Sequence, residues 1–187
     1  MTKPASPNLQ PPEPAGHGIL SNALGDPLSD PLAGVLTVRK MRQDDLAGAL
    51  RLLAMWNMAP RPPSAEIPDP ERATIDIGNA FVAEVEGRIV GTCSYFLLSD
   101  GWAETASLAV EPEPRFAGVG VLLQEARLDE MRRRGVRRVR TETDRPATIR
   151  WYVGRFGYRI VGTNPKKHAF SLPDVDHWTV LELDLTD

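Results

Sequence analysis

At 187 residues, the chain is long enough for one domain with a complete core and some excess. Its formal net charge of −3 provides no overall attraction to nucleic acid or to acidic membranes. The single cysteine, Cys93, excludes an internal disulfide framework and fits a reducing compartment. No apolar run approaches the roughly 20 residues of a membrane helix, and no apolar segment typical of a secretory signal follows Lys3. We therefore expect a cytoplasmic protein that does not associate with membranes.

The first part of the chain differs in composition from the rest. Residues 1–31 hold seven prolines, with Gly, Ser and Asn between them and few large apolar side chains. Such a segment cannot bury enough surface to offset the entropy lost on ordering it. We predict a flexible tail over residues 1–33 and one folded domain over residues 34–187.

Strand and helix patterns begin directly after this tail. Gly34–Arg39 has the pattern of a first strand, and Asp44 or Asp45 is placed to cap the helix that follows. The apolar positions that define the buried face of this helix are Leu46, Ala49, Leu50, Leu53 and Met55–Trp56. Five prolines between Pro60 and Pro70 then exclude regular structure, and a short helix over Glu71–Ile77 is an open alternative.

Three apolar segments separated by turn residues predict an antiparallel meander. The expected strands are Ala80–Glu86, Arg88–Leu98 and Trp102–Val110, with turns at Glu86–Gly87 and Ser99–Gly101. Further elements are predicted in this order: a helix ending near Arg134, a strand over Val136–Thr141, a helix over Ala147–Phe156 that Pro146 opens and Gly157 stops, and strands over Tyr158–Thr163 and Trp178–Leu185. The loop 164–177 is long for a compact domain, and such loops are often functional.

The stretch Leu108–Leu123 organises the rest of the chain. Pro112 and Pro114 end the strand near Val110, and Gly118 and Gly120 remove side chains where the chain enters the next helix. Backbone N–H groups can converge there, and the helix dipole adds partial positive charge, which suits a pyrophosphate. The alternative is that the glycines only allow a tight turn and close packing of helix on strand. A third glycine of a dinucleotide fingerprint is missing at Leu123, and no Gly-Lys-Ser/Thr of a Walker loop is present.

In this setting, Arg115-x-x-Gly118-x-Gly120, preceded by Leu-Ala-Val-x-Pro, resembles the acetyl-CoA motif of the GNAT N-acetyltransferase superfamily. The resemblance extends over about Val35–Leu185. It implies an α/β (α+β) fold with a mixed, mostly antiparallel sheet of about seven strands and about four helices. It also implies an enzyme that transfers an acetyl group from acetyl-CoA to an amine, without a metal ion.

The resemblance assigns cofactor roles to two segments and one side chain. It places the pyrophosphate on the N–H groups of Arg115, Phe116, Ala117, Gly118, Val119, Gly120 and Val121, and the pantetheine arm against the main chain of Leu108, Ala109 and Val110. The arm then pairs like an added strand, and an N–H near Val110 is the usual donor to the oxyanion. Arg145 stands where an asparagine contacting the pantetheine arm is common.

Tyr152 is the first candidate catalytic residue. Ile149-Arg150-Trp151-Tyr152 resembles a helix motif whose tyrosine usually returns a proton to the leaving CoA thiolate. A phenol with a pKa near 10 is a suitable acid for a thiolate whose conjugate thiol has a pKa of about 8.5. The common spacing to the following glycine instead places Val153 at the tyrosine position. A buried core tyrosine is the structural alternative.

Glu104 is the second candidate, because many members of the superfamily keep a carboxylate in this region that receives the amine proton through water. Strand alternation predicts that it shares one face with Ala106 and Leu108. The alternative is a solvated carboxylate at the strand end. Cys93, in an apolar strand pattern, is predicted to be a buried hydrophobic residue, so no acyl-carrying nucleophile is apparent and transfer should be direct.

Other polar clusters fit less specific roles. His168 and His177, with Asp174 and Asp176, match no recognised metal-ligand spacing, and the six arginines between Arg132 and Arg140 suit a solvated face. The expected partners are acetyl-CoA and a primary amine, more often on a small metabolite than on a protein or ribosome-associated amine, and a homodimer is open. The rival classes are a non-catalytic acyl-CoA-binding regulatory module and an RNA-associated protein that uses the arginines.

Overall fold

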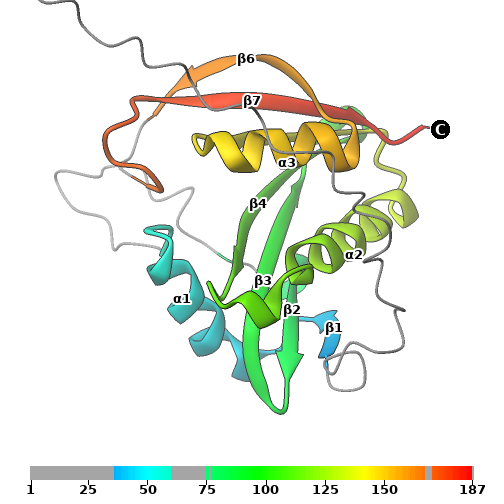
Figure 1. Cartoon of the computed structure of the whole chain (residues 1–187). Coiled ribbons are helices and arrows are strands. Elements are labelled where there is room, and N and C mark those ends of the chain that lie inside the picture. The colour runs from blue at the N-terminus through cyan, green and yellow to red at the C-terminus, as the bar shows by residue number, and fades with distance from the viewer. Residues whose placement is uncertain (1–35, 60–74, 76, 167–169, 187) are drawn as a thin grey trace, which may run out of the picture.

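The computed structural model describes residues 36–59, 75, 77–166 and 170–186 (Figure 1). The predicted tail 1–33, the proline-rich loop and most of the possible helix Glu71–Ile77 therefore lie outside the described residues. The strands are β1 Leu36–Lys40, β2 Ala80–Val85, β3 Arg88–Leu97, β4 Trp102–Val110, β5 Arg138–Thr143, β6 Arg159–Pro165 and β7 His177–Asp184. The α-helices are α1 Leu46–Met55, α2 Val119–Arg133 and α3 Pro146–Phe156, with 3-10 turns at Gln43–Asp45, Ile77–Asn79, Ser99–Gly101 and Pro114–Phe116.

One seven-stranded sheet with the order β1-β2-β3-β4-β5-β7-β6 forms the centre of the molecule. All neighbouring strands are antiparallel except β4 and β5, which run parallel. The predicted mixed, mostly antiparallel sheet is therefore confirmed. The described residues hold three α-helices rather than about four, because a 3-10 turn at Ile77–Asn79 is all that the structure describes of regular structure between α1 and β2.

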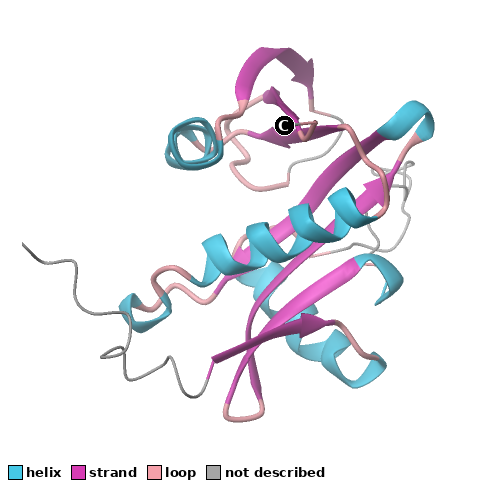
Figure 2. Cartoon of the chain, turned by 90° about the vertical axis from the view of Figure 1, so that its right-hand side faces the viewer, coloured by secondary structure: helices cyan, strands magenta, loops and turns pink. Residues whose placement is uncertain are grey.

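The sheet carries a hydrophobic core on each face. On one face α1 packs against Val82, Ile89 and Ala109 through Ala49, Leu52 and Leu53. On the other face α2 and α3 cover the larger core, as the view along α3 in Figure 2 makes visible. The predicted face of α1 needs correction, because Leu52 is fully buried while Met55, at the end of the helix, is 50% exposed.

A hairpin turn and a glycine within β3 position the elements beside β4. The β2–β3 hairpin closes through Glu86 and Gly87, both with positive φ, as a two-residue hairpin turn requires. At Gly91 in β3, an added Cβ would lie 2.8 Å from Leu123 Cδ1 and 3.0 Å from Val119 Cγ1. The missing side chain thus lets the first turn of α2 approach the sheet closely.

The cap expected before α1 also differs from the prediction. Asp45 makes no side-chain hydrogen bond at the start of α1, and its carboxylate instead accepts a hydrogen bond from the backbone N–H of Arg42, at 2.7 Å, across the preceding 3-10 turn. It also receives two hydrogen bonds from Arg39 on β1, at 2.6 and 2.9 Å. Asp45 therefore joins the first strand to the first helix.

Candidate active site

The central feature of the site is a strand edge that loses its neighbour. The parallel pairing of β4 with β5 runs from Trp102 and Arg138 to Thr105 and Thr141 and then stops, although β4 continues to Val110. On its other side β4 stays paired with β3 as far as Val110. The main chain of residues 106–110 therefore has a strand partner on one side only.

A bulge in β4 lies where this edge begins. Ser107 has φ 54°, and the register with β3 shifts between Thr92 and Ser94. Ala103 and Leu108 pack in the same core, although five residues of regular strand would place them on opposite faces. Glu104, next to Ala103, therefore faces away from Leu108, and the predicted shared face of Glu104 and Leu108 is wrong.

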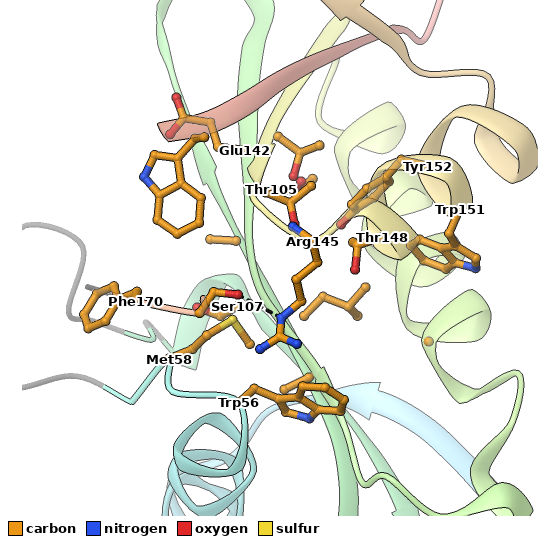
Figure 3. Close-up of a pocket in the computed structure, with 18 of the residues that line it drawn as sticks. Trp56, Met58, Thr105, Ser107, Glu142, Arg145, Thr148, Trp151, Tyr152 and Phe170 are labelled. Carbon is orange, nitrogen blue, oxygen red and sulfur yellow. Dashed lines mark hydrogen bonds between the residues drawn. The ribbon is translucent and has the colours of Figure 1, made fainter. Parts of the chain in front are cut away.

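A cavity of about 440 Å³ opens along the unpaired edge. Its walls come from β4, the end of β5, the start of α3, the residues that follow α1 and the loop before β7. The lining residues are Trp56, Met58, Phe96, Glu104, Thr105, Ala106, Ser107, Leu108, Ala109, Val110, Gly120, Thr141, Glu142, Thr143, Arg145, Ala147, Thr148, Trp151, Tyr152, Phe170, Ser171 and Trp178. Figure 3 shows Arg145 reaching through the middle of this cavity, with Tyr152 on one side and Trp56 below.

Side chains already occupy part of the edge. Trp56 Nε1 donates a hydrogen bond to the Val110 carbonyl at 2.8 Å, and Arg127 Nη1 donates to the Ala106 carbonyl at 2.9 Å. Leu108 and Val110 are half-buried and Ala109 is buried. The predicted pantetheine segment therefore lines the cavity, but its last carbonyl is hydrogen-bonded by Trp56.

The entry into α2 lies at one end of the cavity. Gly118 has φ 92°, a conformation that favours glycine, and Gly120 is the residue of this turn that lines the cavity. The N–H groups of Phe116 and Val121 donate to the carbonyls of Glu113 and Gly118, at 3.0 and 2.9 Å.

The remaining predicted residues at this entry divide between surface and core. Val119 and Gly120 lie in the first turn of α2, where N–H groups have no acceptor inside the helix. Ala117 is exposed, and Phe116 and Val119 are buried in the core. The Arg115 guanidinium is exposed and pairs with Glu113 at 2.8 Å, outside the cavity lining.

Tyr152, on α3, also lines the cavity. Its side chain is 3% exposed and its hydroxyl accepts a hydrogen bond from Arg127 Nη2 at 2.9 Å. Val153, the residue at the common spacing, is 41% exposed on the surface. The extra residue before Gly157 is accommodated at the end of α3, where the N–H of Tyr158 donates to the Tyr152 carbonyl at 3.3 Å.

Arg127 is a fully buried arginine beneath the site. Its Nε donates to Gln124 Oε1 at 2.7 Å, and Nη1 also donates to the Ser94 carbonyl at 3.0 Å. Gln124 in turn donates to the Tyr158 hydroxyl at 3.1 Å. Every acceptor around Arg127 within the described residues is a neutral oxygen, so the guanidinium charge faces the bulge of β4 and the Tyr152 hydroxyl without a carboxylate.

The loop before β7 is held over the cavity by a buried ion pair. Lys166 Nζ lies 2.5 Å from Asp144 Oδ2, and the two side chains are 4% and 0% exposed. Burial acts to raise the pKa of Asp144, but hydrogen bonds from Lys166 and from the N–H of Leu172 outweigh it, so that this pKa lies below its ordinary value. Lys166 also donates to the carbonyls of Phe170 and Leu172, at 2.9 and 2.6 Å. The pair thus fixes the part of the loop that supplies Phe170 and Ser171 to the cavity.

The same loop is joined to the end of α1. The N–H of Ser171 donates to the Asn57 carbonyl at 3.0 Å, and Asn57 Nδ2 donates to the Ser171 carbonyl at 3.3 Å. The two segments that flank this junction both line the cavity, with Trp56 and Met58 on one side and Phe170 on the other. This bridge fixes the two segments to each other at the cavity wall.

The structure brings together seven of the residues predicted for the site: Glu104, Leu108, Ala109, Val110, Gly120, Arg145 and Tyr152. Sequence reasoning missed the aromatic residues Trp56 and Phe170 because they lie just outside regular elements. It also missed Arg127, for which a signal was present. Gln124, Arg127 and Met131 recur at helical spacing on α2, so Arg127 occupies a core position despite its charge.

Cys93 is buried, as predicted, and burial raises the pKa of its thiol to about 11. The arginine cluster of residues 132–140 largely forms ion pairs, with Asp129, Glu130, Glu182 and Asp184. His168 lies outside the described residues, and the exposed His177 contacts Asp176 at 2.9 Å. The described residues contain no group of three or more His, Cys, Asp or Glu side chains that could hold a metal ion, and no helix among them is long and apolar enough to span a membrane.

Comparison with known proteins gave a family and a set of similar structures. The model of the Acetyltransferase (GNAT) family matches residues 37–158. N-acetylglutamate synthase from Neisseria gonorrhoeae, complexed with coenzyme A and L-arginine, is 18% identical with a TM-score of 0.61, and the match covers 82% of this chain and 34% of the synthase. This chain thus spans about a third of the synthase.

Two further structures match over most of their own length. The ribosomal-protein-S18-alanine N-acetyltransferase from Escherichia coli is 18% identical with a TM-score of 0.61, over 81% of this chain and 95% of that one. An N-acetyltransferase from Staphylococcus aureus Mu50 is 17% identical with a TM-score of 0.60, over 81% and 99%. At these identities the likeness concerns the fold. A comparison with curated proteins gave no match.

Proposed function

The chain belongs to the GNAT acetyltransferase family, and on this premise we propose that it transfers an acetyl group from acetyl-CoA directly to the primary amine of a small metabolite. The observation that carries the proposal is the end of β4–β5 pairing at Thr105 and Thr141, which leaves an unpaired strand edge inside a cavity. An unpaired edge can hydrogen-bond an extended ligand such as the amide-containing pantetheine arm.

The residues present fit acetyl-CoA. The first turn of α2, with Gly118 and Gly120, would hold the diphosphate through its N–H groups, and Val119 supplies an N–H without an acceptor in the helix. Arg115 would add positive charge on leaving Glu113. Leu108, Ala109 and Val110 would pair with the pantetheine arm, and Trp56 would release the Val110 carbonyl if that carbonyl takes part.

Acetyl-CoA supplies the acetyl group as a thioester. In the proposed reaction the amine nitrogen forms a bond to the acetyl carbon, the carbon–sulfur bond breaks, and the thiolate takes a proton. Tyr152 would give that proton, because its oxygen accepts the Arg127 hydrogen bond and its own hydrogen can point into the cavity. Glu104, on the cavity wall, would receive the proton lost by the amine, through water.

Support for a small acceptor comes from the bridge between Asn57 and Ser171. This bridge joins the segments that carry Trp56, Met58 and Phe170 on the cavity wall, so together they would form a surface for the body of a small acceptor. The cavity of about 440 Å³ lies within the range of small-molecule sites.

The proposal is tested by measuring CoA release with acetyl-CoA and a panel of primary amines, for the wild type and for Tyr152→Phe. We expect at least one amine to be acetylated by the wild type, and kcat to fall by about 100-fold or more in the variant while acetyl-CoA binding stays unchanged. Binding of acetyl-CoA without turnover of any amine would instead favour a non-catalytic acyl-CoA-binding module. Unchanged kcat in Tyr152→Phe would remove the assigned proton donor.

A further inference from the structure

Arg145 is a charged side chain in the part of the cavity lined by Trp56 and Ser171, which we call the acceptor end. It is the residue before α3, and its half-buried guanidinium extends away from Tyr152 towards Trp56 (Figure 3). Nε donates a hydrogen bond to Ser171 Oγ at 2.8 Å, and the guanidinium carbon lies 5.0 Å from the centre of the Trp56 ring. Both partners belong to the two segments that the Asn57–Ser171 bridge joins.

The guanidinium has no carboxylate partner in the described part of the chain. Arg39 and Arg51, which are also half-buried, lie 2.6 Å from a carboxylate oxygen of Asp45 and Glu111 respectively. A partly desolvated charge is costly unless an opposite charge compensates it. Arg145 therefore presents to the cavity a half-buried positive charge that a negatively charged ligand could neutralise.

The geometry also leaves the two terminal nitrogens of Arg145 available to donate hydrogen bonds to a ligand. Ser171 uses Nε, and Nη1 and Nη2 make no hydrogen bond to a described residue. A planar guanidinium with two terminal nitrogens available binds a carboxylate through two parallel hydrogen bonds. The cation–π contact with Trp56 and the hydrogen bond to Ser171 restrain the guanidinium and so limit the entropy lost on binding.

The cavity wall around Arg145 is mixed, with apolar and aromatic side chains, hydroxyl groups such as those of Ser107 and Thr148, and a second carboxylate at Glu142. Met58 and Phe170 line the cavity beside Trp56, and Glu104 lines it along β4. A carboxylate on Arg145 would direct the rest of the acceptor over these apolar side chains, and its ammonium group would meet the opposite charge of Glu104. The lining thus suits a molecule that carries both charges on an apolar body.

From these observations we propose that Arg145 binds the carboxylate of the acceptor, so that the substrate class is a primary amine that also bears a carboxylate, as free amino acids do. This inference rests on the proposed acetyltransferase function. It differs from the role that the resemblance implies for this position, contact with the pantetheine arm, because both contacts of the guanidinium belong to the segments joined by the Asn57–Ser171 bridge and neither belongs to β4.

The test uses matched acceptors that differ only in the carboxylate. Initial rates are measured with acetyl-CoA and α- and ω-amino acids, each beside its own carboxamide, with a phosphate-bearing amine and a polyamine as further arms. The proteins are the wild type, Arg145→Gln and the control Arg150→Gln, which removes an exposed arginine from the helix that follows Arg145. We expect kcat/KM of the wild type to favour a free acid over its amide by roughly 10- to 100-fold.

Arg145→Gln should remove the preference for the free acid by raising the KM of the amino acid, and it should leave the KM of acetyl-CoA unchanged. Arg150→Gln should retain the preference for the free acid. The inference is overturned if amides, polyamines or phosphate-bearing amines are acetylated as well as or better than the acids, or if Arg145→Gln raises the KM of acetyl-CoA instead. In those cases the acetyltransferase function stands. If the wild type acetylates no member of the panel, the proposed function fails and the inference falls with it.

Discussion

At the scale of single residues, Arg127 connects the core to the chemistry. It is 0% exposed, and one guanidinium holds the carbonyls of Ser94 and Ala106 at the β4 bulge together with the Tyr152 hydroxyl. Because the Tyr152 oxygen is used as an acceptor, the hydroxyl hydrogen is directed elsewhere. Arg127 is thus a positioning residue for the proposed proton donor. Its hydrogen bonds also satisfy the backbone carbonyls at the β4 bulge.

Replacing Arg127 by lysine keeps the positive charge but removes most of the hydrogen bonds. The loss of stability and the loss of kcat can then both be attributed to the hydrogen bonds. A lysine ammonium cannot reach all four acceptors, so we expect the free energy of unfolding to fall by roughly 2–4 kcal/mol. We also expect kcat to fall about tenfold at temperatures where the variant is fully folded, and the double variant with Tyr152→Phe to be no slower than Tyr152→Phe alone. Urea unfolding and steady-state kinetics measure both quantities.

The matched control for this change is Arg132→Lys, on the same helix. Arg132 is exposed and pairs with Asp129 at 2.9 Å, so its free energy of unfolding should change by less than about 0.5 kcal/mol. Additive losses of kcat in Arg127→Lys with Tyr152→Phe would show that Arg127 does not act through Tyr152, and an unchanged kcat in Arg127→Lys would show that it acts on stability alone.

At the scale of elements, an acidic residue docks α2 on the edge of the sheet. Glu130 on α2 accepts hydrogen bonds from Lys40 on β1 at 2.7 Å and from Arg134 at 2.8 Å. The hydrogen bond from Lys40 is the main reason why the pKa of Glu130 falls from 4.5 to about 2, with burial opposing it and Arg134 adding to it. The folded state therefore releases the Glu130 proton more readily than the unfolded state does.

This shift gives a pH dependence with a defined sign. The stabilisation from Glu130 is complete above the unfolded pKa of about 4.5 and is lost as the pH falls towards about 2. We expect Glu130→Gln to lower the free energy of unfolding by roughly 1–3 kcal/mol at pH 7, and the difference from the wild type to shrink between pH 4.5 and pH 2. Urea unfolding at a series of pH values measures the difference. Asp129→Asn, at a side chain 65% exposed, should leave the profile unchanged, and parallel curves for wild type and Glu130→Gln would contradict the assignment.

At the scale of the whole molecule, the order of elements followed from the sequence because each signal is local. Proline and glycine marked the ends of β4 and α3, and alternation of apolar residues marked β2 and β3. The bulge at Ser107 was not predictable, because nothing in Ala-Ser-Leu distinguishes it from regular strand. The part of the site that contains Trp56, Phe170 and Ser171 was not predictable either, since hydrogen bonds between distant segments, Trp56 to Val110 and Ser171 to Asn57, position it.

The early end of β4–β5 pairing also predicts how the molecule responds to its co-substrate. The cavity along the unpaired edge is lined by β4 on one side and by β5, α3 and the loop before β7 on the other, so a ligand bound there contacts both sides. At a concentration 100-fold above its Kd, acetyl-CoA should stabilise the fold by about 2.7 kcal/mol, which for a domain of this size raises Tm by roughly 5–10 °C. Acetyl-pantetheine, which shares the thioester arm and lacks the diphosphate, should raise Tm by less than about a third of that at the same concentration, because the N–H groups at the start of α2 stay unused. CoA without the acetyl group should resemble acetyl-CoA in the same thermal-shift measurement. Equal shifts from acetyl-pantetheine and acetyl-CoA would mean that the turn of Gly118 and Gly120 serves packing alone.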